Sequence, residues 1–214
     1  MNKNIEIFDE NVSEYEDWFD RYPYVFQSEV EAVREMLPEG ESLYGIEIGL
    51  GTGQYSAALN IKEGVEPSDN MRALARKRGL DVMNAVAESL PYKDMHFDFA
   101  VILFSISYFQ DVAAAFEEAH RILKNHGCLI VGFLDKDSVI GKAYTLHKAD
   151  STFYRNANFY GVARMMEKLR MAGFRNFKIS QTLFGDLESI STLQPSREGS
   201  GEGSFVVIRA EKKI

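Results

Sequence analysis

The sequence has little cysteine and no long apolar run, and each absence excludes a class of protein. The single cysteine, Cys128, cannot form a disulfide within the chain, and one thiol is too few for a thiolate metal site. It lies in the apolar run CLIVGFL, which is typical of a core strand. No stretch approaches transmembrane length, and MNKNIEIFDENVSEYEDWF has no signal-peptide pattern. We therefore expect a cytoplasmic protein with no metal site and no membrane partner.

Basic residues are in deficit. The chain carries 24 Lys and Arg against 32 Asp and Glu, which gives a formal net charge of -8. The one basic cluster, Arg76-Lys77-Arg78, fits the C-terminal end of a helix, where cations interact favourably with the helix dipole. Because nucleic-acid binding needs a positive surface, we expect no nucleic-acid partner. The oligomeric state is left open.

The hydrophobic pattern predicts an α/β protein. At 214 residues the chain is long enough for one domain with its own core. Apolar runs of strand length alternate with segments of helical period, as in a doubly wound parallel sheet with helices on both faces. A capping box at Ser28 and Glu31 predicts a helix start, Asp111 can cap another helix, and a further helix is predicted over 162–172. The predicted strands are 43–49, 63–66, 82–86, 97–104, 128–134, 174–184 and 204–210.

The stretch IEIGLGTGQYS contains the most informative motif. Three glycines, Gly49, Gly51 and Gly53, follow an apolar strand, and such a turn lets the backbone approach a nucleotide-containing ligand closely. The dinucleotide fingerprint requires a further glycine, but the two positions where it could fall hold Gln54 and Ser56. No Gly-Lys-Ser or Gly-Lys-Thr of a Walker loop is present.

Two carboxylates narrow the choice of ligand. Glu47 precedes the glycines and would repel a pyrophosphate but attract an ammonium group. Glu66 ends the second predicted strand, 19 residues later, where an acidic side chain accepts hydrogen bonds from ribose hydroxyls. A ligand that has a ribose and an ammonium group but no phosphate is S-adenosylmethionine.

Several motifs, in the same order, resemble those of class I S-adenosylmethionine-dependent methyltransferases of the type-11 group. The glycine motif of that group runs Glu/Asp-x-Gly-x-Gly-x-Gly, and later stretches of this chain are also similar: GVEPSDNMRALARKRG, AESLPYKDMHFDFAVI and EAHRILKNHGCLIVGF. The resemblance covers about residues 8–184. It implies a Rossmann-like seven-stranded sheet, mostly parallel, with an antiparallel C-terminal edge strand. One departure is Val86, where the family often has Asp.

The resemblance implies a site as well as a fold. S-adenosyl-L-methionine would be the cofactor and S-adenosyl-L-homocysteine the product, with methyl transfer to an unidentified small-molecule acceptor. Since ligands bind at the carboxyl ends of the strands, Leu103 should border the methyl group. The expected cofactor-binding residues are Glu47, Gly49, Gly51, Gly53, Glu66, Pro67, Met71, Ala87, Glu88 and Leu103.

The acceptor side is predicted more coarsely. Residues 1–214 would form a single methyltransferase domain, in which 1–40 form an N-terminal helical cap and 135–160 a substrate-side insertion. Methyl transfer from a sulfonium requires orientation first, and a base only when the nucleophile arrives protonated, so no catalytic residue is assigned. The candidate substrate residues are Tyr15, Trp18, Tyr22, His147 and Tyr154.

Two alternatives stay open at this point. A non-catalytic module that binds S-adenosylmethionine or S-adenosylhomocysteine would show the same motifs, because methyl transfer has no obligatory catalytic side chain. A nicotinamide-dependent oxidoreductase would need a third packing glycine and a parallel sixth strand. The sequence offers neither.

Overall fold

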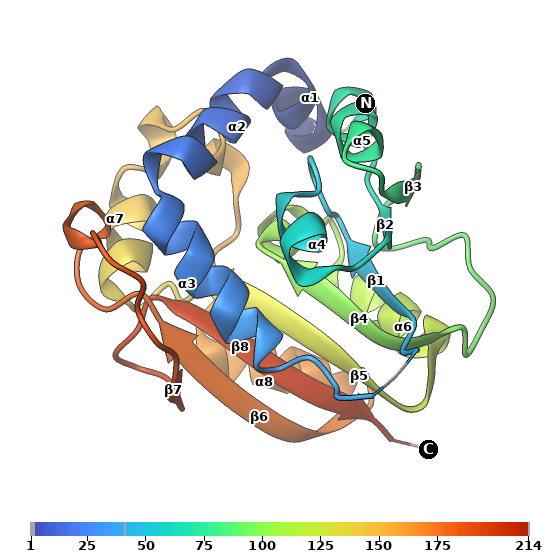
Figure 1. The fold of residues 1–214 in the computed structure, drawn as a ribbon. Helices are drawn as coiled ribbons and strands as arrows, with labels where there is room; N and C mark the ends of the chain where they lie inside the picture. Colours follow the sequence, from blue (N-terminus) through green and yellow to red (C-terminus); the bar gives the residue numbers. More distant parts are fainter. Residues whose placement is uncertain (1–2, 41, 214) are drawn as a thin grey trace.

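The computed structural model describes residues 3–40 and 42–213, and within them eight strands form one mixed sheet (Figure 1). The strand order is β3-β2-β1-β4-β5-β8-β6-β7. All pairings among β1 to β5 are parallel, whereas β8 runs antiparallel to both β5 and β6. The strands are β1 (Gly45–Ile48), β2 (Glu63–Val65), β3 (Asp81–Met83), β4 (Phe97–Leu103), β5 (Leu123–Leu134), β6 (Phe174–Thr182), β7 (Arg197–Glu198) and β8 (Phe205–Lys212).

The expected doubly wound, mostly parallel fold class is confirmed, with two differences in detail. The sheet has an eighth strand, the two-residue β7, which pairs with β6 inside the glycine- and serine-rich connection. The C-terminal strand β8 is not at the edge but lies between β5 and β6. Its run Phe205 to Ile208 is buried on both faces, which suits an interior strand, while β6 carries several exposed side chains.

Helices cover both faces of the sheet, and the alternation of side chains along each strand separates two cores. In β4, Ala100 and Ile102 face the core under α6 and α8, and Val101 and Leu103 face the core under α3 and α4. The α-helices are α1 (Lys3–Glu10), α2 (Val12–Arg21), α3 (Pro23–Arg34), α4 (Gln54–Leu59), α5 (Asp69–Lys77), α6 (Val112–Ile122), α7 (Val139–Leu146) and α8 (Val162–Met171). Short 3-10 helices are η1 (Ser105–Tyr108), η2 (Lys148–Asp150), η3 (Tyr154–Asn156) and η4 (Leu187–Ser189).

The N-terminal helices cross the top of the molecule. In Figure 1, α1 and α2 run above the sheet from the side of α5 to that of α7. Asp9 in α1 accepts hydrogen bonds from Ser68 Oγ and from the backbone and side-chain amides of Asn70, which ties the cap to the start of α5. Of the 1–40 segment predicted as a cap, residues 1–2 lie outside the described residues, as do 41 and 214 of the predicted domain.

One predicted helix start is wrong. Helix α3 begins at Pro23, so Ser28 lies inside it, where its hydroxyl donates to the carbonyl of Tyr24 (2.6 Å). Proline at the first position of a helix has its dihedral angle fixed for that site and loses no hydrogen bond there, which explains the earlier start. The cap predicted at Asp111 is confirmed, since its carboxylate accepts from Ala113 N and Ala114 N.

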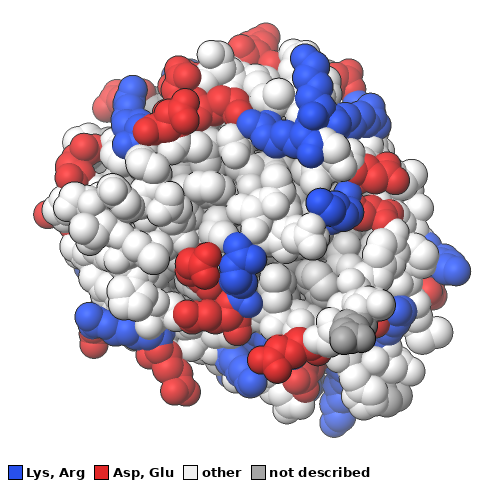
Figure 2. Space-filling model, in the orientation of Figure 1, with Lys and Arg blue, Asp and Glu red and all other residues white. Residues whose placement is uncertain are grey.

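The basic cluster at the end of α5 is used within the molecule. Arg76 and Lys77 form the last turn of α5, and Arg78 is its C-cap. The Arg78 guanidinium donates to the carbonyl of Thr52 (2.8 Å) and pairs with Glu16. Figure 2 shows basic side chains gathered near α5 with acidic ones beside them, and side chains of both signs elsewhere on this face. Within the described residues, no helix is both long and apolar enough to cross a bilayer.

Candidate functional site

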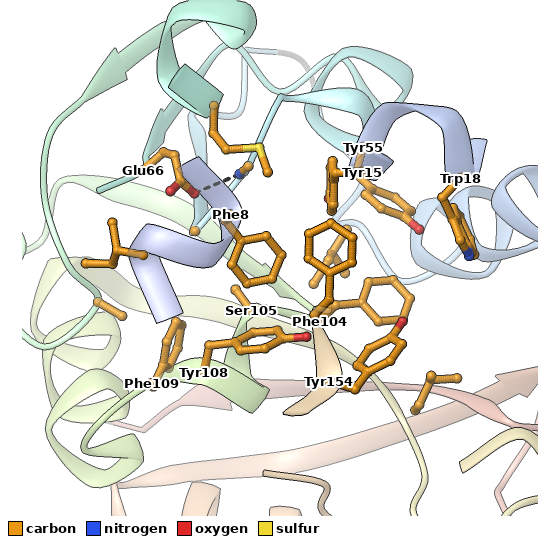
Figure 3. Close-up of a pocket in the computed structure, with 18 of the residues that line it drawn as sticks. Phe8, Tyr15, Trp18, Tyr55, Glu66, Phe104, Ser105, Tyr108, Phe109 and Tyr154 are labelled. Atoms are coloured by element: carbon orange, nitrogen blue, oxygen red, sulfur yellow. Dashed lines mark hydrogen bonds between the residues drawn. The ribbon is translucent and has the colours of Figure 1, made fainter. Parts of the chain in front are cut away.

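A cavity of about 610 Å³ opens at the carboxyl ends of the parallel strands, beneath the N-terminal helices. The loops after β1, β2 and β4 form its floor, and α1, α2, η1 and η3 contribute the walls. Figure 3 shows Glu66 on one side of this cavity and an aromatic group with Tyr55, Trp18 and Tyr154 on the other. We call these sides the glycine-loop half and the aromatic half.

The glycine loop has the conformation that its sequence predicts. Gly49, Gly51 and Gly53 all have positive φ, at +75°, +60° and +82°, a region that disfavours other residues. Gly49 and Gly51 line the cavity. A Cβ at Gly51 would lie 3.3 Å from the hydroxyl of Tyr15. The third glycine has a different task, because a Cβ at Gly53 would lie 2.3 Å from Leu80. Gly53 therefore serves packing, outside the cavity lining.

Glu66 is held at the end of β2 by backbone donors. Its carboxylate accepts from Gly51 N and from Ser68 N, both at 2.9 Å, and the residue is 7% exposed while lining the cavity. Burial raises the pKa of Glu66 to about 7 against the opposing effect of these two hydrogen bonds. The carboxylate is thus fixed in position with its open side toward the cavity.

Glu47 lies under the loop and not in the cavity lining. It is 1% exposed and accepts a hydrogen bond from Ser56 Oγ in α4. Burial raises its pKa to about 8. In this conformation the Glu47 side chain ties β1 to α4 and supports the loop from below.

The remaining predicted cofactor residues are brought together. Pro67, Met71, Ala87, Glu88 and Leu103 all line the cavity. Glu88 Oε1 already accepts from Gln110 N and Asp111 N, at 2.7 and 3.1 Å, so it also orders the start of α6. Ile5 and Phe8 of α1 and Phe109, the residue after η1, also line the cavity, although no expectation from the sequence includes them. No local motif marks these three positions.

Three of the five predicted substrate residues line the cavity, and two do not. Tyr15, Trp18 and Tyr154 are part of the lining. The hydroxyl of Tyr22 instead donates to Glu188 (2.5 Å), and His147 is exposed in a shallow hollow beside Tyr144 and Tyr154. Further aromatic side chains complete the lining: Phe19, Tyr55, Phe104, Tyr108, Tyr144 and Phe153.

One buried acid in the aromatic half was also missed. Glu29 lies on the inward face of α3, one turn from Val25 and from Val33, and is 1% exposed while lining the cavity. Tyr55 Oη donates to its Oε2 (2.5 Å). Burial raises the pKa of Glu29 to about 8. The signal that could have found it is a carboxylate at helical spacing between two apolar residues.

Among the charged residues in the described lining of the cavity, acidic ones outnumber basic ones. Arg21 is the one basic side chain of that lining, and it is exposed at the rim. The acids number six: Glu14, Asp17, Glu29, Glu66, Glu88 and Asp111. This balance favours cationic ligands.

The comparisons with known proteins agree with this geometry. Residues 46–131 match the family described as "Methyltransferase domain". A solved structure from Thermotoga maritima, described as a "SAM-dependent methyltransferase, possible histamine N-methyltransferase", is 47% identical, with a TM-score of 0.94 and coverage of 97% of this chain and 99% of that one. The chain belongs to the S-adenosylmethionine-dependent methyltransferases.

Two further relatives of these methyltransferases differ in distance. An uncharacterised protein of Methanocaldococcus jannaschii is 40% identical over 97% of this chain and all of its own length. A demethylmenaquinone methyltransferase of Chlorobaculum tepidum is 28% identical, over 48% of this chain and 46% of its own length. The chain is therefore an enzyme that uses S-adenosylmethionine, and its relatives leave the acceptor to be identified.

The residues present are chemically suited to this cofactor. The hollow above Gly51, which a side chain there would fill, lies beside the Glu66 carboxylate and in an acidic cavity. S-adenosylmethionine carries a ribose diol, a sulfonium and an ammonium group. A carboxylate at the end of β2 can accept from the diol, and the acidic lining suits the cationic groups.

Proposed function

We propose that this methyltransferase transfers the methyl group to a small-molecule acceptor that binds in the aromatic half of the cavity. The observation that supports this division is the continuity of the cavity, which joins the glycine loop and Glu66 to a wall that includes Trp18, Tyr55 and Tyr154. Its volume of about 610 Å³ falls within the usual range of small-ligand sites, roughly 300 to 1,000 Å³.

In this proposal the glycine-loop half holds the cofactor. The backbone at Gly49 and Gly51 lies against its amino-acid part, Glu66 accepts from the ribose, and Pro67, Met71, Ala87 and Glu88 flank the adenine. Leu103, at the end of β4, borders the methyl group. Glu47 and Gly53 act from beneath, by holding the loop in place. The cofactor supplies an activated methyl group on a sulfonium that leaves as a neutral thioether.

The chain's own contribution is orientation and the exclusion of water. Proximity and alignment can lower a barrier by about 7 to 11 kcal/mol. We assign the cap, 1–40, and the insertion, 135–160, to this task, because Tyr15 and Trp18 come from the first segment and Tyr144, Phe153 and Tyr154 from the second. The histamine named for the Thermotoga maritima relative is a small flat amine, and we include it among the acceptors to be tested.

Calorimetric titration with S-adenosylmethionine, S-adenosylhomocysteine and NADH tests the cofactor assignment. We expect binding of the first two, with dissociation constants in the micromolar range, and no heat from NADH. Binding of NADH alone would overturn the assignment and favour the oxidoreductase.

A turnover assay then identifies the acceptor and distinguishes methyl transfer from cofactor binding without reaction. Release of S-adenosylhomocysteine would be followed over a panel of small amines, phenols, thiols and carboxylic acids, with histamine included. We expect at least one acceptor to raise the rate above hydrolysis of the cofactor. Cofactor binding with no turnover on any acceptor would favour the non-catalytic binding module.

A further inference from the structure

The buried carboxylate of Glu29 lacks a cationic partner. Within the described residues no Lys, Arg or His forms an ion pair with it, and its one side-chain hydrogen bond comes from Tyr55. That bond reaches Oε2, and among the described residues no side-chain hydrogen bond reaches Oε1. Buried carboxylates are costly unless they are paired, and natural proteins seldom leave one in an apolar core without a use.

The surroundings of Glu29 match the chemistry of an ammonium group. The nearby lining includes the rings of Trp18, Tyr55, Tyr144 and Tyr154, with Tyr144 and Tyr154 packed at a centroid separation of 4.5 Å. Burial raises the pKa of Tyr144 to about 12, and the charge of Glu29 adds to that rise. Aromatic faces attract cations, and a carboxylate among them completes a site for an organic ammonium ion.

The residues that we expect to hold the cofactor come from other elements of the lining than Glu29 does. Glu66, Pro67 and Met71 lie at the carboxyl end of β2 and the start of α5, whereas Glu29 comes from α3 and packs with Tyr55 of α4 on the aromatic side. The one guanidinium in the described lining, Arg21, is exposed at the rim. The buried carboxyl group of Glu29 therefore faces space that a second ligand would occupy.

We propose that the acceptor is a cationic amine, and that Glu29 binds its ammonium group within the cage of Trp18, Tyr55, Tyr144 and Tyr154. This inference rests on the proposed function, since it places the acceptor in the aromatic half. It assigns Glu29 to recognition of the acceptor and Tyr55 to positioning of the Glu29 carboxylate through its hydrogen bond. An acceptor with a neutral hydroxyl in place of the ammonium group binds more weakly.

The test measures binding of matched probes to the complex with S-adenosylhomocysteine. Phenethylamine is compared with 2-phenylethanol, and tryptamine with tryptophol, because each pair differs only in its ammonium or hydroxyl group. We expect the wild-type complex to bind at least one amine at least tenfold more tightly than its alcohol. Glu29→Gln, which is nearly isosteric, should abolish that preference and leave the affinity for S-adenosylhomocysteine within about twofold of wild type.

A matched variant and a fold check make the outcomes distinct. Glu31→Gln removes a charge from the exposed face of the same helix, outside the cavity lining, and should retain the preference, because solvent and salt screen that position. Thermal melting confirms that Glu29→Gln is folded, and Tyr55→Phe provides a second variant that should weaken amine binding.

Three results would each overturn the inference: equal binding of amine and alcohol, no amine binding at millimolar concentrations, or a preference that survives Glu29→Gln. Loss of S-adenosylhomocysteine affinity in Glu29→Gln would also overturn it, by assigning the carboxylate to the cofactor. Failure of the wild type to bind S-adenosylhomocysteine would instead refute the proposed function.

Discussion

The two halves of the cavity each contain a buried carboxylate, but they hold it in different ways. The Glu66 carboxylate accepts hydrogen bonds from the backbone amides of Gly51 and Ser68, which belong to the loops that follow β1 and β2. The Glu29 carboxyl group accepts one hydrogen bond, from the hydroxyl of Tyr55, and is otherwise surrounded by aromatic and aliphatic groups. Burial raises both pKa values, to about 7 for Glu66 and to about 8 for Glu29. Backbone donors thus hold the first carboxylate, whereas a side-chain hydroxyl and side-chain packing hold the second.

This difference explains what each half can do. A site built from strand ends and backbone amides is the same whatever the acceptor, so it suits a cofactor shared by many enzymes. A site built from side chains of α2, α3, α4, α7 and η3 can change by substitution without disturbing the sheet. We therefore assign cofactor binding to the glycine-loop half and choice of acceptor to the aromatic half.

The largest expected effect is a loss of cofactor affinity when a glycine of the loop is substituted. Gly51→Val places a branched side chain at φ +60°, with its Cβ directed at Tyr15. We expect cofactor affinity to fall by about a thousandfold or more, which corresponds to about 4 kcal/mol. Calorimetry with S-adenosylhomocysteine measures it.

A matched glycine supplies the control for Gly51→Val. Gly79 also has a positive φ, of +82°, but its Cβ would meet nothing within 4 Å. Gly79→Val carries similar backbone strain and should bind the cofactor normally, although both variants will melt earlier than wild type. Wild-type affinity in Gly51→Val would show that the cofactor does not approach this loop, and the distinction between the two halves would fail.

The glycine-loop half was largely predictable from sequence because its residues are defined by their distance from strand ends. Gly51, Glu66 and Met71 follow from a strand, a turn and a helix start that local patterns reveal. Glu47 and Gly53 were identified for the same reason, yet the pattern could not distinguish lining from support. That distinction depends on α4 and Leu80, which pack beneath the loop.

The aromatic half was predictable only as a group. Tyr15 and Trp18 are expected because they lie in a predicted helical cap, but the place of Tyr55 in the lining depends on the packing of α4 against α3. His147 is the exposed C-cap of α7 and lies beside Tyr144 and Tyr154 in a separate hollow, outside the cavity lining. Such positions depend on how helices pack, which no short motif records.

The next expected effect is a pH dependence of stability that comes from the buried carboxyl group of Glu29. Because the folded-state pKa of Glu29 lies above the 4.5 of an ordinary glutamate, the folded protein binds more protons than the unfolded chain between about pH 4.5 and 8. Glu29 therefore lowers the free energy of unfolding, by an amount that grows as pH rises through this window. Tyr55, Tyr144 and Tyr154 stay neutral across it, since burial raises their pKa values as well.

Glu29→Gln removes that dependence. Relative to wild type, the variant should gain on the order of 3 kcal/mol of unfolding free energy between pH 5 and pH 8.5 in the absence of ligand. Urea denaturation at the two pH values measures the gain. Glu31→Gln, an exposed change two residues along α3, should show no such dependence. A Glu29→Gln difference that is the same at both pH values would mean that Glu29 is already solvated or paired, and that it does not differ from an ordinary surface acid.

The smallest expected effect tests the glycine-loop half by its charge. Glu66→Ala should weaken S-adenosylhomocysteine binding by about 1 to 3 kcal/mol, because charged hydrogen bonds to the ribose and the ordering of Gly51 N are both lost. Calorimetry measures it on the folded variant. Glu63→Ala is the matched control, since Glu63 begins the same strand and does not line the cavity. Its cofactor affinity should be unchanged. If Glu66→Ala also keeps wild-type affinity, the carboxylate serves only to hold the loop, and the glycine-loop half would then bind its ligand through backbone and packing alone.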